Sequence, residues 1–423
     1  MSTAPPGRHD SYAAFRQRDF RSYLAGVIVS TLGSQMQDVA VGWQLYERTH
    51  SAMALGLVGL VQVIPVILLV LPAGHAADRF DRRRLLMLAE MVMAAAAIGL
   101  AVISFTGAPT PLIYGAMLLS GISRAFYGPA RSSLLAQLVS RETFGSAVTW
   151  NSGGWQLASV AGPALGGAVI GLTRAATLAY VLNATAALSF VALLATIRSR
   201  APARSQDVAT WSTLIAGVRF VARTKTLLAS ITLDMFAVLL GGATTLLPMF
   251  AKDILHVGPS GLGWLLAAPS IGAFVMAMAL AHRPPLRRAG PTLLWAVTGF
   301  GAATILFGLS RSYGLSLVAL VLTGAFDNIS VVVRSTLLQL LTPDDMRGRV
   351  SAVNSVFIGT SNELGGFESG AIAALFGPVF SVVAGGVGTI VVVLAVARHW
   401  PQVRGLGSLA ELGKQEHPPP GSA

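Results

Sequence analysis

Twelve long apolar segments dominate this sequence and limit what it can fold into. About 20 residues of α-helix are needed to cross the roughly 30 Å hydrocarbon core of a bilayer. Of the 423 residues, 53% are hydrophobic and 11% are charged, whereas soluble domains have about 25% charged residues. The sequence therefore predicts an all-α integral membrane protein. The expected spans lie near residues 22–45, 54–73, 85–105, 112–136, 144–171, 177–197, 227–250, 261–281, 292–309, 315–341, 350–375 and 379–397.

Basic residues are unevenly distributed between the two sides of these spans. If the N-terminus is cytoplasmic, about 23 Lys and Arg residues lie on that side and about 4 on the other. Loops rich in Lys and Arg stay in the cytoplasm, so we expect both termini there. Topology then accounts for the net charge of +12, and no nucleic-acid partner is expected. Residues 1–21 are polar and do not have the pattern of a cleavable signal peptide.

The two halves of the chain repeat each other. Residues 131–152 align without gaps on residues 334–355, at an offset of 203, with 8 of 22 positions identical. The register extends to the glycine pairs Gly121/Gly324, Gly162/Gly365 and Gly167/Gly370. Chance similarity between apolar segments is the alternative, but the match continues through a polar loop. Parallel repeats are a common transporter architecture, so two pseudo-symmetric six-helix bundles are predicted.

The longest internal polar stretch separates these halves. Its second part places Trp211, Val218 and Val221 on one helical face, with Arg219 and Arg223 opposite, as in a helix lying on a membrane surface. We predict an N-terminal bundle at 1–197, a cytoplasmic linker with an interfacial amphipathic helix at 198–226, a C-terminal bundle at 227–397 and a cytoplasmic tail at 398–423.

Ionisable residues inside the spans are candidates for function, because each costs at least about 2.5–3.5 kcal/mol at mid-bilayer. Asp38 is the first choice for carrying a proton, since polar side chains share its span. Arg124 would be a counter-ion or an anion-binding group. The alternative for each is a structural ion pair between helices. The buried-charge or proton-coupling candidates are Asp38, Arg124, Asp234, Asp327, Glu363 and Glu368.

Polar and aromatic side chains within the spans are candidates for lining a substrate cavity. Trp155 lies well inside its span and can stack on a planar or amphipathic compound, whereas Trp43 and Trp264 are better interpreted as interfacial anchors. The candidate cavity residues are Gln35, Gln44, Trp155, Gln156, Asn328 and Asn362.

A charged turn follows the second span, with the pattern Gly74-x-x-x-Asp78-Arg79-x-x-Arg82-Arg83. A carboxylate near a helix start and several guanidinium forks can bridge neighbouring helices and latch one conformation. The alternative is a loop that only fixes topology. The pattern resembles the signature loop of the major facilitator superfamily, and the resemblance implies that these five residues form a gating element.

The fifth span contains Gly162-Pro163-x-x-Gly166-Gly167. Small residues let helices approach closely, and a Gly-Pro pair can bend a helix. The pattern resembles the antiporter motif of drug/proton exporters, although Ala158 stands where those exporters usually have glycine. Ordinary small-residue packing is the alternative.

The whole chain is similar to the branch of the superfamily that contains the enterobactin exporter and related drug efflux proteins. Residues that carry this resemblance include Gln35–Asp38, Tyr127–Arg131 and Thr342–Arg349. It implies a monomeric, multi-pass secondary transporter of a bacterial plasma or inner membrane, exporting a drug or a siderophore-like metabolite by alternating access and proton antiport.

Other functions remain as alternatives. An uptake symporter or facilitator would share the fold, and the motif in span five is the main discriminator. A membrane sensor or enzyme lacks support, because neither an appended soluble domain nor a His-Glu-x-x-His motif occurs. No cofactor or metal is expected: the chain has no cysteine and no nucleotide-binding Gly-x-x-x-x-Gly-Lys motif. The expected partners are a small-molecule substrate, protons and the lipid bilayer.

Overall fold

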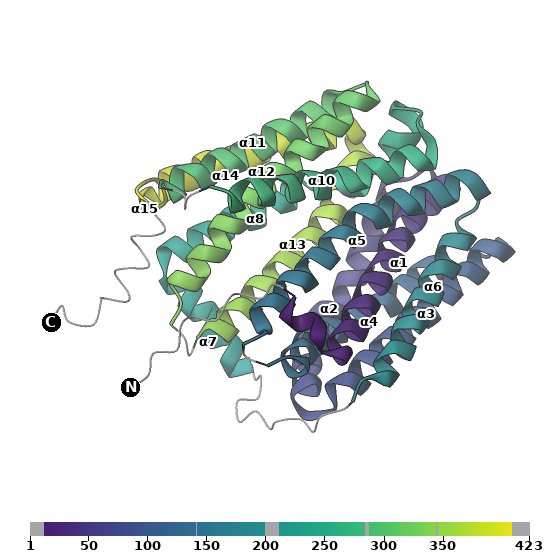
Figure 1. Cartoon of the computed structure of the whole chain (residues 1–423). Helices are drawn as coiled ribbons and strands as arrows, with labels where there is room; N and C mark the ends of the chain where they lie inside the picture. Colours follow the sequence, from purple (N-terminus) through teal and green to yellow (C-terminus); the bar gives the residue numbers. More distant parts are fainter. Residues whose placement is uncertain (1–11, 141, 199–210, 284–286, 344–345, 408–423) are drawn as a thin grey trace.

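The computed structural model describes residues 12–140, 142–198, 211–283, 287–343 and 346–407, and long helices make up most of this part (Figure 1). The first half contains α1 (Arg18–Thr49), α2 (Ala52–Arg79), α3 (Arg82–Thr106), α4 (Pro111–Leu138), α5 (Phe144–Thr173) and α6 (Thr177–Thr196). The second half contains α8 (Lys225–Leu240), η2 (Ala243–Leu246), α9 (Leu247–Met249), η3 (Phe250–Ile254), α10 (Gly258–Ala281), α11 (Ala289–Leu309), α12 (Tyr313–Leu340), α13 (Arg347–Phe376) and α14 (Pro378–His399). Three shorter elements are η1 (Ala13–Arg16), α7 (Trp211–Arg223) and α15 (Pro401–Arg404).

The long helices match the predicted membrane spans in position. Each expected span coincides with one long helix, and residues 227–250 match the stretch from α8 to η3, which is broken at Gly241 and Gly242. Within the described residues, nine helical segments are long and apolar enough to cross a bilayer. The long helices outside this set are α1, α4 and α13. These three helices carry Asp38, Arg124 and Glu363, whose side chains come together.

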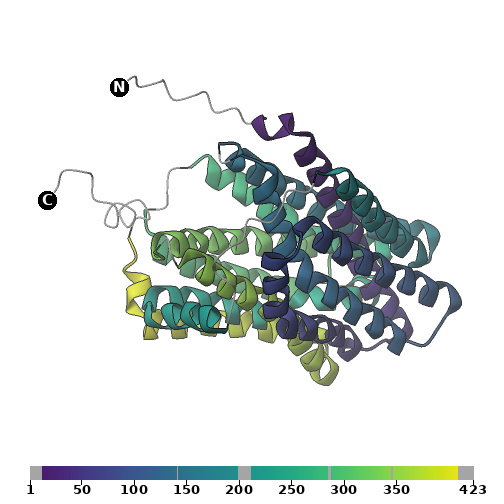
Figure 2. The same ribbon diagram turned by 90° about the horizontal axis from the view of Figure 1, so that it is seen from below.

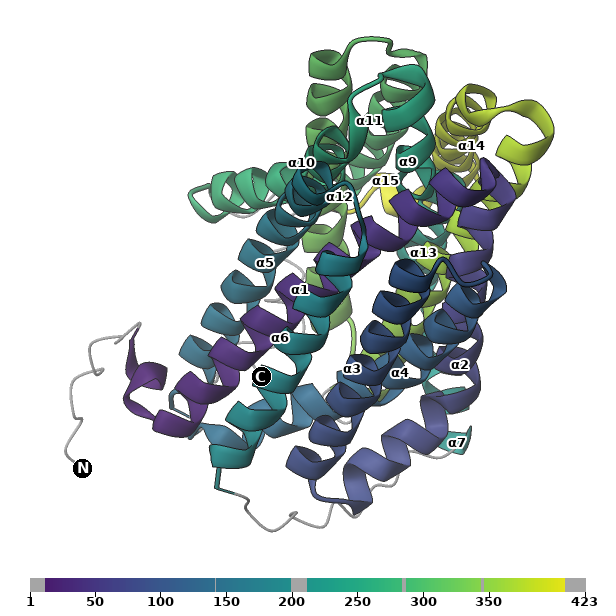
Figure 3. The ribbon, with the colours of Figure 1, turned by 90° about the vertical axis from the view of Figure 1, so that its right-hand side faces the viewer.

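The spans form two bundles of the same architecture. Helices α1 to α6 pack among themselves, and the stretch from α8 to α14 does the same (Figures 1 and 3). Helices α5 and α13 begin and end 203 residues apart, as the repeat predicts. Gly121 brings α4 against α2, and its counterpart Gly324 brings α12 against α10. The predicted pseudo-symmetric pair of six-helix bundles is confirmed.

The two bundles meet through α5 with α10 and through α2 with α13. A Cβ added at Gly167 would lie 2.5 Å from the carbonyl oxygen of Pro259, and one at Gly370 would lie 2.8 Å from that of Ala52. Because Gly167 and Gly370 are equivalent in the repeat, the two interfaces are equivalent as well. Both lie at what we call the far end, which holds the α1–α2 and α5–α6 turns.

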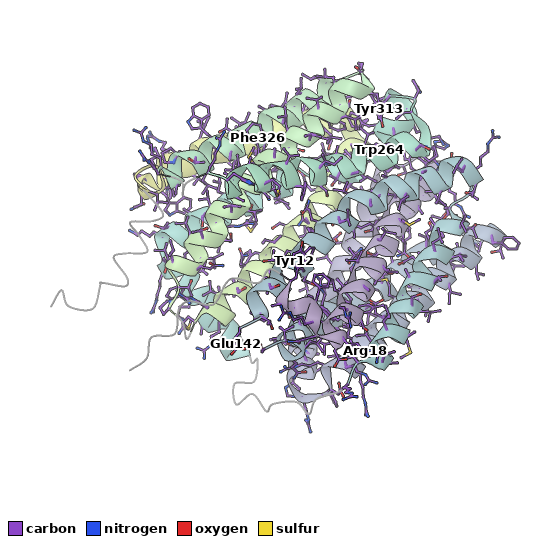
Figure 4. All side chains as sticks on the ribbon, viewed as in Figure 1. Tyr12, Arg18, Glu142, Trp264, Tyr313 and Phe326 are labelled. Carbon is purple, nitrogen blue, oxygen red and sulfur yellow. The ribbon has the colours of Figure 1, made fainter. Side chains whose placement is uncertain are left out.

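The opposite end, called the terminal end, holds η1 and α15, which lie on the same side of the molecule (Figure 2). Trp264 and Tyr313 mark the far end, and Tyr12 and Glu142 lie toward the terminal end (Figure 4). Trp264 is 51% exposed at the start of α10, a position that fits an interfacial anchor.

Two segments outside the spans also pack against the C-terminal half. Helix α7 lies on α8 and α13, where Val221 is buried while Ile215 and Val218 are exposed. These three apolar residues therefore divide between the protein and the outer surface. Val403 of α15 is buried as well, and Gly407 accepts a 3.1 Å hydrogen bond from the amide of Ala289. Residues 199–210 and 408–423, which belong to the predicted linker and tail, lie outside the described residues.

Candidate functional site

Three of the predicted intramembrane charges form one cluster that joins the two halves. Nη2 of Arg124 lies 3.1 Å from each carboxylate oxygen of Asp38, within the first half. Nη1 of the same guanidinium lies 3.6 Å from Oε1 of Glu363, on α13 of the second half. The three side chains keep 31–40% exposure, so they face open space rather than a closed core. One arginine thus connects two carboxylates from opposite halves.

Two cavities meet at this cluster, and Asp38 and Arg124 line both of them. The central cavity, of about 260 Å³, extends toward the far end between α1, α2 and the broken stretch at Thr244 and Pro248, and Glu363 also lines it. The N-half cavity, of about 230 Å³, lies among α1, α3, α4 and α5. The cluster therefore stands between the two cavities.

The N-half cavity contains an acidic residue that the sequence analysis missed. Glu90 of α3 is buried and accepts a 2.8 Å hydrogen bond from Oγ of Ser30, while its Oε2 has no partner within the described part of the chain. Gln35 and Trp155 line the same cavity, and their role in binding substrate stays a prediction. Glu90 is an acid inside an apolar run, so the rule that selected Asp38 would also have selected it.

The second half has a cavity of its own, which we call the C-half cavity. Its volume is about 260 Å³, and Asp327 and Asn362 line it together with the break at Gly241 and Gly242. Thr244 lines both this cavity and the central one. Asn328, next in sequence, does not line this cavity, and its buried Oδ1 is without a hydrogen-bond partner among the described residues.

The remaining candidates lie away from the three cavities. Asp234 forms a buried ion pair with Arg334 between α8 and α12. Gln44 accepts a 2.7 Å hydrogen bond from the hydroxyl of Tyr180. Oε2 of Glu368 accepts a 3.5 Å hydrogen bond from the hydroxyl of the neighbouring Ser369. Asp234 and Gln44 thus each have a partner within their own bundle, and these contacts hold helices of that bundle together.

Gln156 has a different place, because it bonds across the interface between the halves. Its Nε2 donates a 2.8 Å hydrogen bond to the carbonyl oxygen of Ser270 on α10. Gln156 therefore belongs to the α5–α10 interface rather than to the cavity wall.

The charged turn after the second span lies at the terminal end, with Gly74, Asp78 and Arg79 in α2 and Arg82 and Arg83 in α3. The side chain of Asp78 lies outside the described part of the structure. Among the described residues, the two α3 arginines contact the first half: Arg83 donates a 2.6 Å hydrogen bond to the carbonyl of Ile197, and Arg82 reaches those of Ala77 and Ser133. These bonds tie α3 to α2, α4 and the end of α6. A gating role for the turn stays a prediction.

The Gly-Pro-x-x-Gly-Gly segment packs α5 against two helices at once. A Cβ at Gly162 would lie 2.5 Å from Cβ of Gln35, and one at Gly166 would lie 2.9 Å from Cα of Met36. On the other side of α5, Gly167 and the carbonyl of Pro163 meet Gly263 of α10. The motif therefore lets one helix contact both its own half and the opposite one.

Polar contacts join the halves at the far end. The hydroxyl of Tyr46 donates to the carboxylate of Asp253, and Nζ of Lys252 lies 3.2 Å from Oε1 of Glu47. Both pairs connect the end of α1 to η3. Their residues lie near span ends, where the sequence analysis attached no role to charge.

We expect the Glu47–Lys252 pair to contribute little to stability, because its side chains are 48% and 27% exposed and such pairs are worth about 0.2–1 kcal/mol. Lys252→Ala should shift the free energy of unfolding in detergent by less than about 1 kcal/mol. A double-mutant cycle with Glu47→Gln measures the pair alone. A coupling above about 2 kcal/mol would contradict this expectation.

Comparison with known proteins places the chain within one family. Residues 9–420 match the family model described as transmembrane secretion effector. The chain is 28% identical over 402 residues to the enterobactin exporter of Escherichia coli (strain K12), covering 90% of this chain and 93% of that protein.

Solved structures agree on the fold. A bacterial homologue of the human lysosomal transporter Spinster, in an inward-facing and unoccupied conformation, aligns with a TM-score of 0.72 at 16% identity, covering 92% of this chain and 98% of that one. A POT family transporter in complex with 5-aminolevulinic acid also gives 0.72, at 12% identity over 92% and 97% of the two chains. At these identities the likeness concerns the fold alone.

Proposed function

The chain belongs to the transmembrane secretion effectors of the major facilitator superfamily, and from this membership we propose that it exports a small amphipathic compound in exchange for protons. It is a multi-pass membrane transporter, and relatives that match about nine tenths of its length include enterobactin exporters. A siderophore-like metabolite is therefore the first substrate class to test. The proposal includes a monomeric protein with both termini in the cytoplasm.

The observation that carries this proposal is the Asp38–Arg124–Glu363 cluster between two cavities. A carboxylate in a membrane interior can take up a proton when its cationic partner moves away, and release it when the partner returns. Arg124 has two carboxylate partners, one in each half. Movement of the halves relative to one another would change which carboxylate it neutralises, and this links proton binding to conformation.

The far-end contacts support alternating access as the mode of transport. In the described conformation the halves meet there through α5–α10 and α2–α13. With the terminal end in the cytoplasm, as the distribution of basic residues predicts, this is a state closed toward the outside. Release of the substrate outside then requires these contacts to separate.

Transport in proteoliposomes tests the proposal. We would measure enterobactin accumulation with and without an imposed pH gradient, in wild type and in Asp38→Asn. A gradient of about one pH unit should raise wild-type accumulation about tenfold for each proton exchanged, because one pH unit corresponds to about 1.36 kcal/mol, and it should not change accumulation by the variant. Glu368→Gln, which removes a carboxylate outside the three cavities, should behave like wild type. Equal wild-type rates in both conditions would exclude proton antiport, whereas gradient-driven uptake in the opposite direction would indicate a symporter.

A further inference from the structure

Arg131 is a cation in the N-half cavity for which the proposed proton exchange has no use. It lies on α4 about two helical turns after Arg124, on the same face of the helix, and both arginines line the cavity. Its counterpart in the repeat, Arg334, forms a buried ion pair with Asp234. Among the described residues, no carboxylate lies within ion-pair distance of Arg131. One half of the molecule thus neutralises this arginine, and the other leaves it beside a cavity.

The two acids that line the N-half cavity have other partners. Asp38 receives both of its 3.1 Å contacts from Arg124. Glu90 is 2% exposed and accepts a 2.8 Å hydrogen bond from Ser30. A charge within a membrane span is costly unless an opposite charge pairs with it. Arg131 therefore marks a place in this cavity where a negative charge is stabilised.

The contacts of Arg131 use little of its hydrogen-bonding capacity. Nη2 lies 3.4 Å from Oδ1 of Asn151, and Cζ lies 5.8 Å from the centroid of the Tyr127 ring. Among the described residues, the guanidinium thus donates one side-chain hydrogen bond, although it carries five N–H donors in a planar fork. Such a fork binds a carboxylate through two parallel hydrogen bonds. Arg131 is therefore suited to a planar oxyanion that enters the cavity.

Aromatic side chains stand beside this guanidinium. Trp155 lies about one turn after Asn151 on α5, lines the cavity and is 47% exposed. Tyr127 lines the cavity from α4. Aromatic faces pack well against other flat rings. Thr31 and Gln35 of α1 add a hydroxyl and an amide to the wall. The cavity therefore combines a fork for an anion with a flat apolar surface.

We infer that the N-half cavity binds the carboxylate of a planar aromatic compound, with Arg131 as its counter-ion and Trp155 as its stacking surface. A single guanidinium matches one negative charge, whereas a phosphate dianion would add surplus negative charge to a cavity that already holds Asp38 and Glu90. The volume of about 230 Å³ accommodates a fused pair of aromatic rings. The inference rests on the proposed export function for the role of this ligand as cargo. Equilibrium binding needs no pH gradient, so the two proposals can fail separately.

Binding of radiolabelled 2-naphthoate to the purified full-length chain in detergent tests the site. The amide 2-naphthamide has the same shape without the charge and serves as the competitor control. We expect saturable binding that the amide does not displace, and Arg131→Gln should weaken it about tenfold or more, as for loss of a charge-assisted hydrogen bond. Arg131→Lys keeps the charge without the fork and should bind with intermediate affinity.

Two further variants test the rest of the site. Trp155→Ala should also reduce the affinity, because it removes the stacking surface. Arg174→Gln removes an arginine from an exposed turn at the far end, so it is the matched control and should bind like wild type.

Three results would overturn the inference. The first is absence of saturable binding, or equal affinity of wild type and Arg131→Gln with both proteins folded by thermal melting. The second is equal displacement by 2-naphthamide and by unlabelled 2-naphthoate, which needs no variant and would show that the charge is not recognised. The third is loss of binding in Arg124→Gln but not in Arg131→Gln, which would place the anion at the charge cluster. A loss of gradient-driven export with naphthoate binding intact would count against proton antiport alone.

Discussion

Replacement of Arg124 by Gln is expected to lower gradient-driven export about 100-fold. The change leaves the carboxylates of Asp38 and Glu363 facing one another across the interface without the cation that now contacts both. Breaking a buried ion pair by removing one partner costs about 3–5 kcal/mol. Because these side chains are about one third to two fifths exposed, we expect a cost at the lower end of this range. A 100-fold change corresponds to roughly 3 kcal/mol. One carboxylate would then keep its proton whether or not a gradient is present.

The same proteoliposome assay measures this effect, and two further variants identify its cause. Arg124→Lys keeps the charge but loses the planar fork that contacts both oxygens of Asp38, so it should retain an intermediate rate. The triple variant Asp38→Asn, Arg124→Gln, Glu363→Gln removes the repulsion and should recover thermal stability without recovering the response to pH. If Arg124→Gln transports like wild type, the cluster has no part in coupling.

Gly167→Val is expected to prevent closure of the far end. Even a single added carbon at Gly167 would lie 2.5 Å from the carbonyl oxygen of Pro259 and 2.8 Å from Cα of Gly263. Both neighbours are backbone atoms, so the clash can be relieved only by moving α5 away from α10. Overpacking of this kind costs about 1–3 kcal/mol, which would change the ratio of closed to open molecules roughly 5- to 150-fold. We expect the variant to populate the open far end and to export at a small fraction of the wild-type rate.

Distance measurements between spin labels can follow this change directly, because the chain contains no native cysteine. Labels at Arg174→Cys and Arg311→Cys report on exposed turns of opposite halves at the far end. Gly153→Val is the matched control, since it lies on the same helix and a Cβ there would meet nothing within 4 Å. An unchanged distance distribution in Gly167→Val would show that the glycine contact does not control closure.

Much of the fold could be predicted from the sequence because lipid imposes simple rules. A helix must satisfy its own backbone, so the lengths of the apolar runs fixed the spans. The gap-free match between residues 131–152 and 334–355 placed α5 and α13 in equivalent positions. The break at Gly241 and Gly242 escaped prediction, because glycine inside a span is as compatible with close helix packing as with a broken helix.

The candidate site was predicted in part. Asp38, Arg124 and Glu363 were each selected because charge is costly in a membrane, yet no spacing rule connects residues so far apart in the chain. Asp234 met the same criterion and is paired with Arg334 inside one bundle. A charged residue within an apolar run shows from the sequence alone that burial is costly. The partner of that charge depends on how helices from different parts of the chain come together.

The far-end interfaces have a consequence for the speed of the proposed alternating-access cycle. At Gly167 against Gly263, and at Gly370 against Gly56, backbone meets backbone with hardly any side chain between. Smooth surfaces of this kind hold no interdigitated rotamers that must be disengaged before they part. The two contacts are also related by the repeat, so they can separate together as the halves rock about a common axis. Such a pair of contacts would give a low activation barrier for opening. Turnover would then be limited by release of the charge cluster rather than by unpacking of the helices.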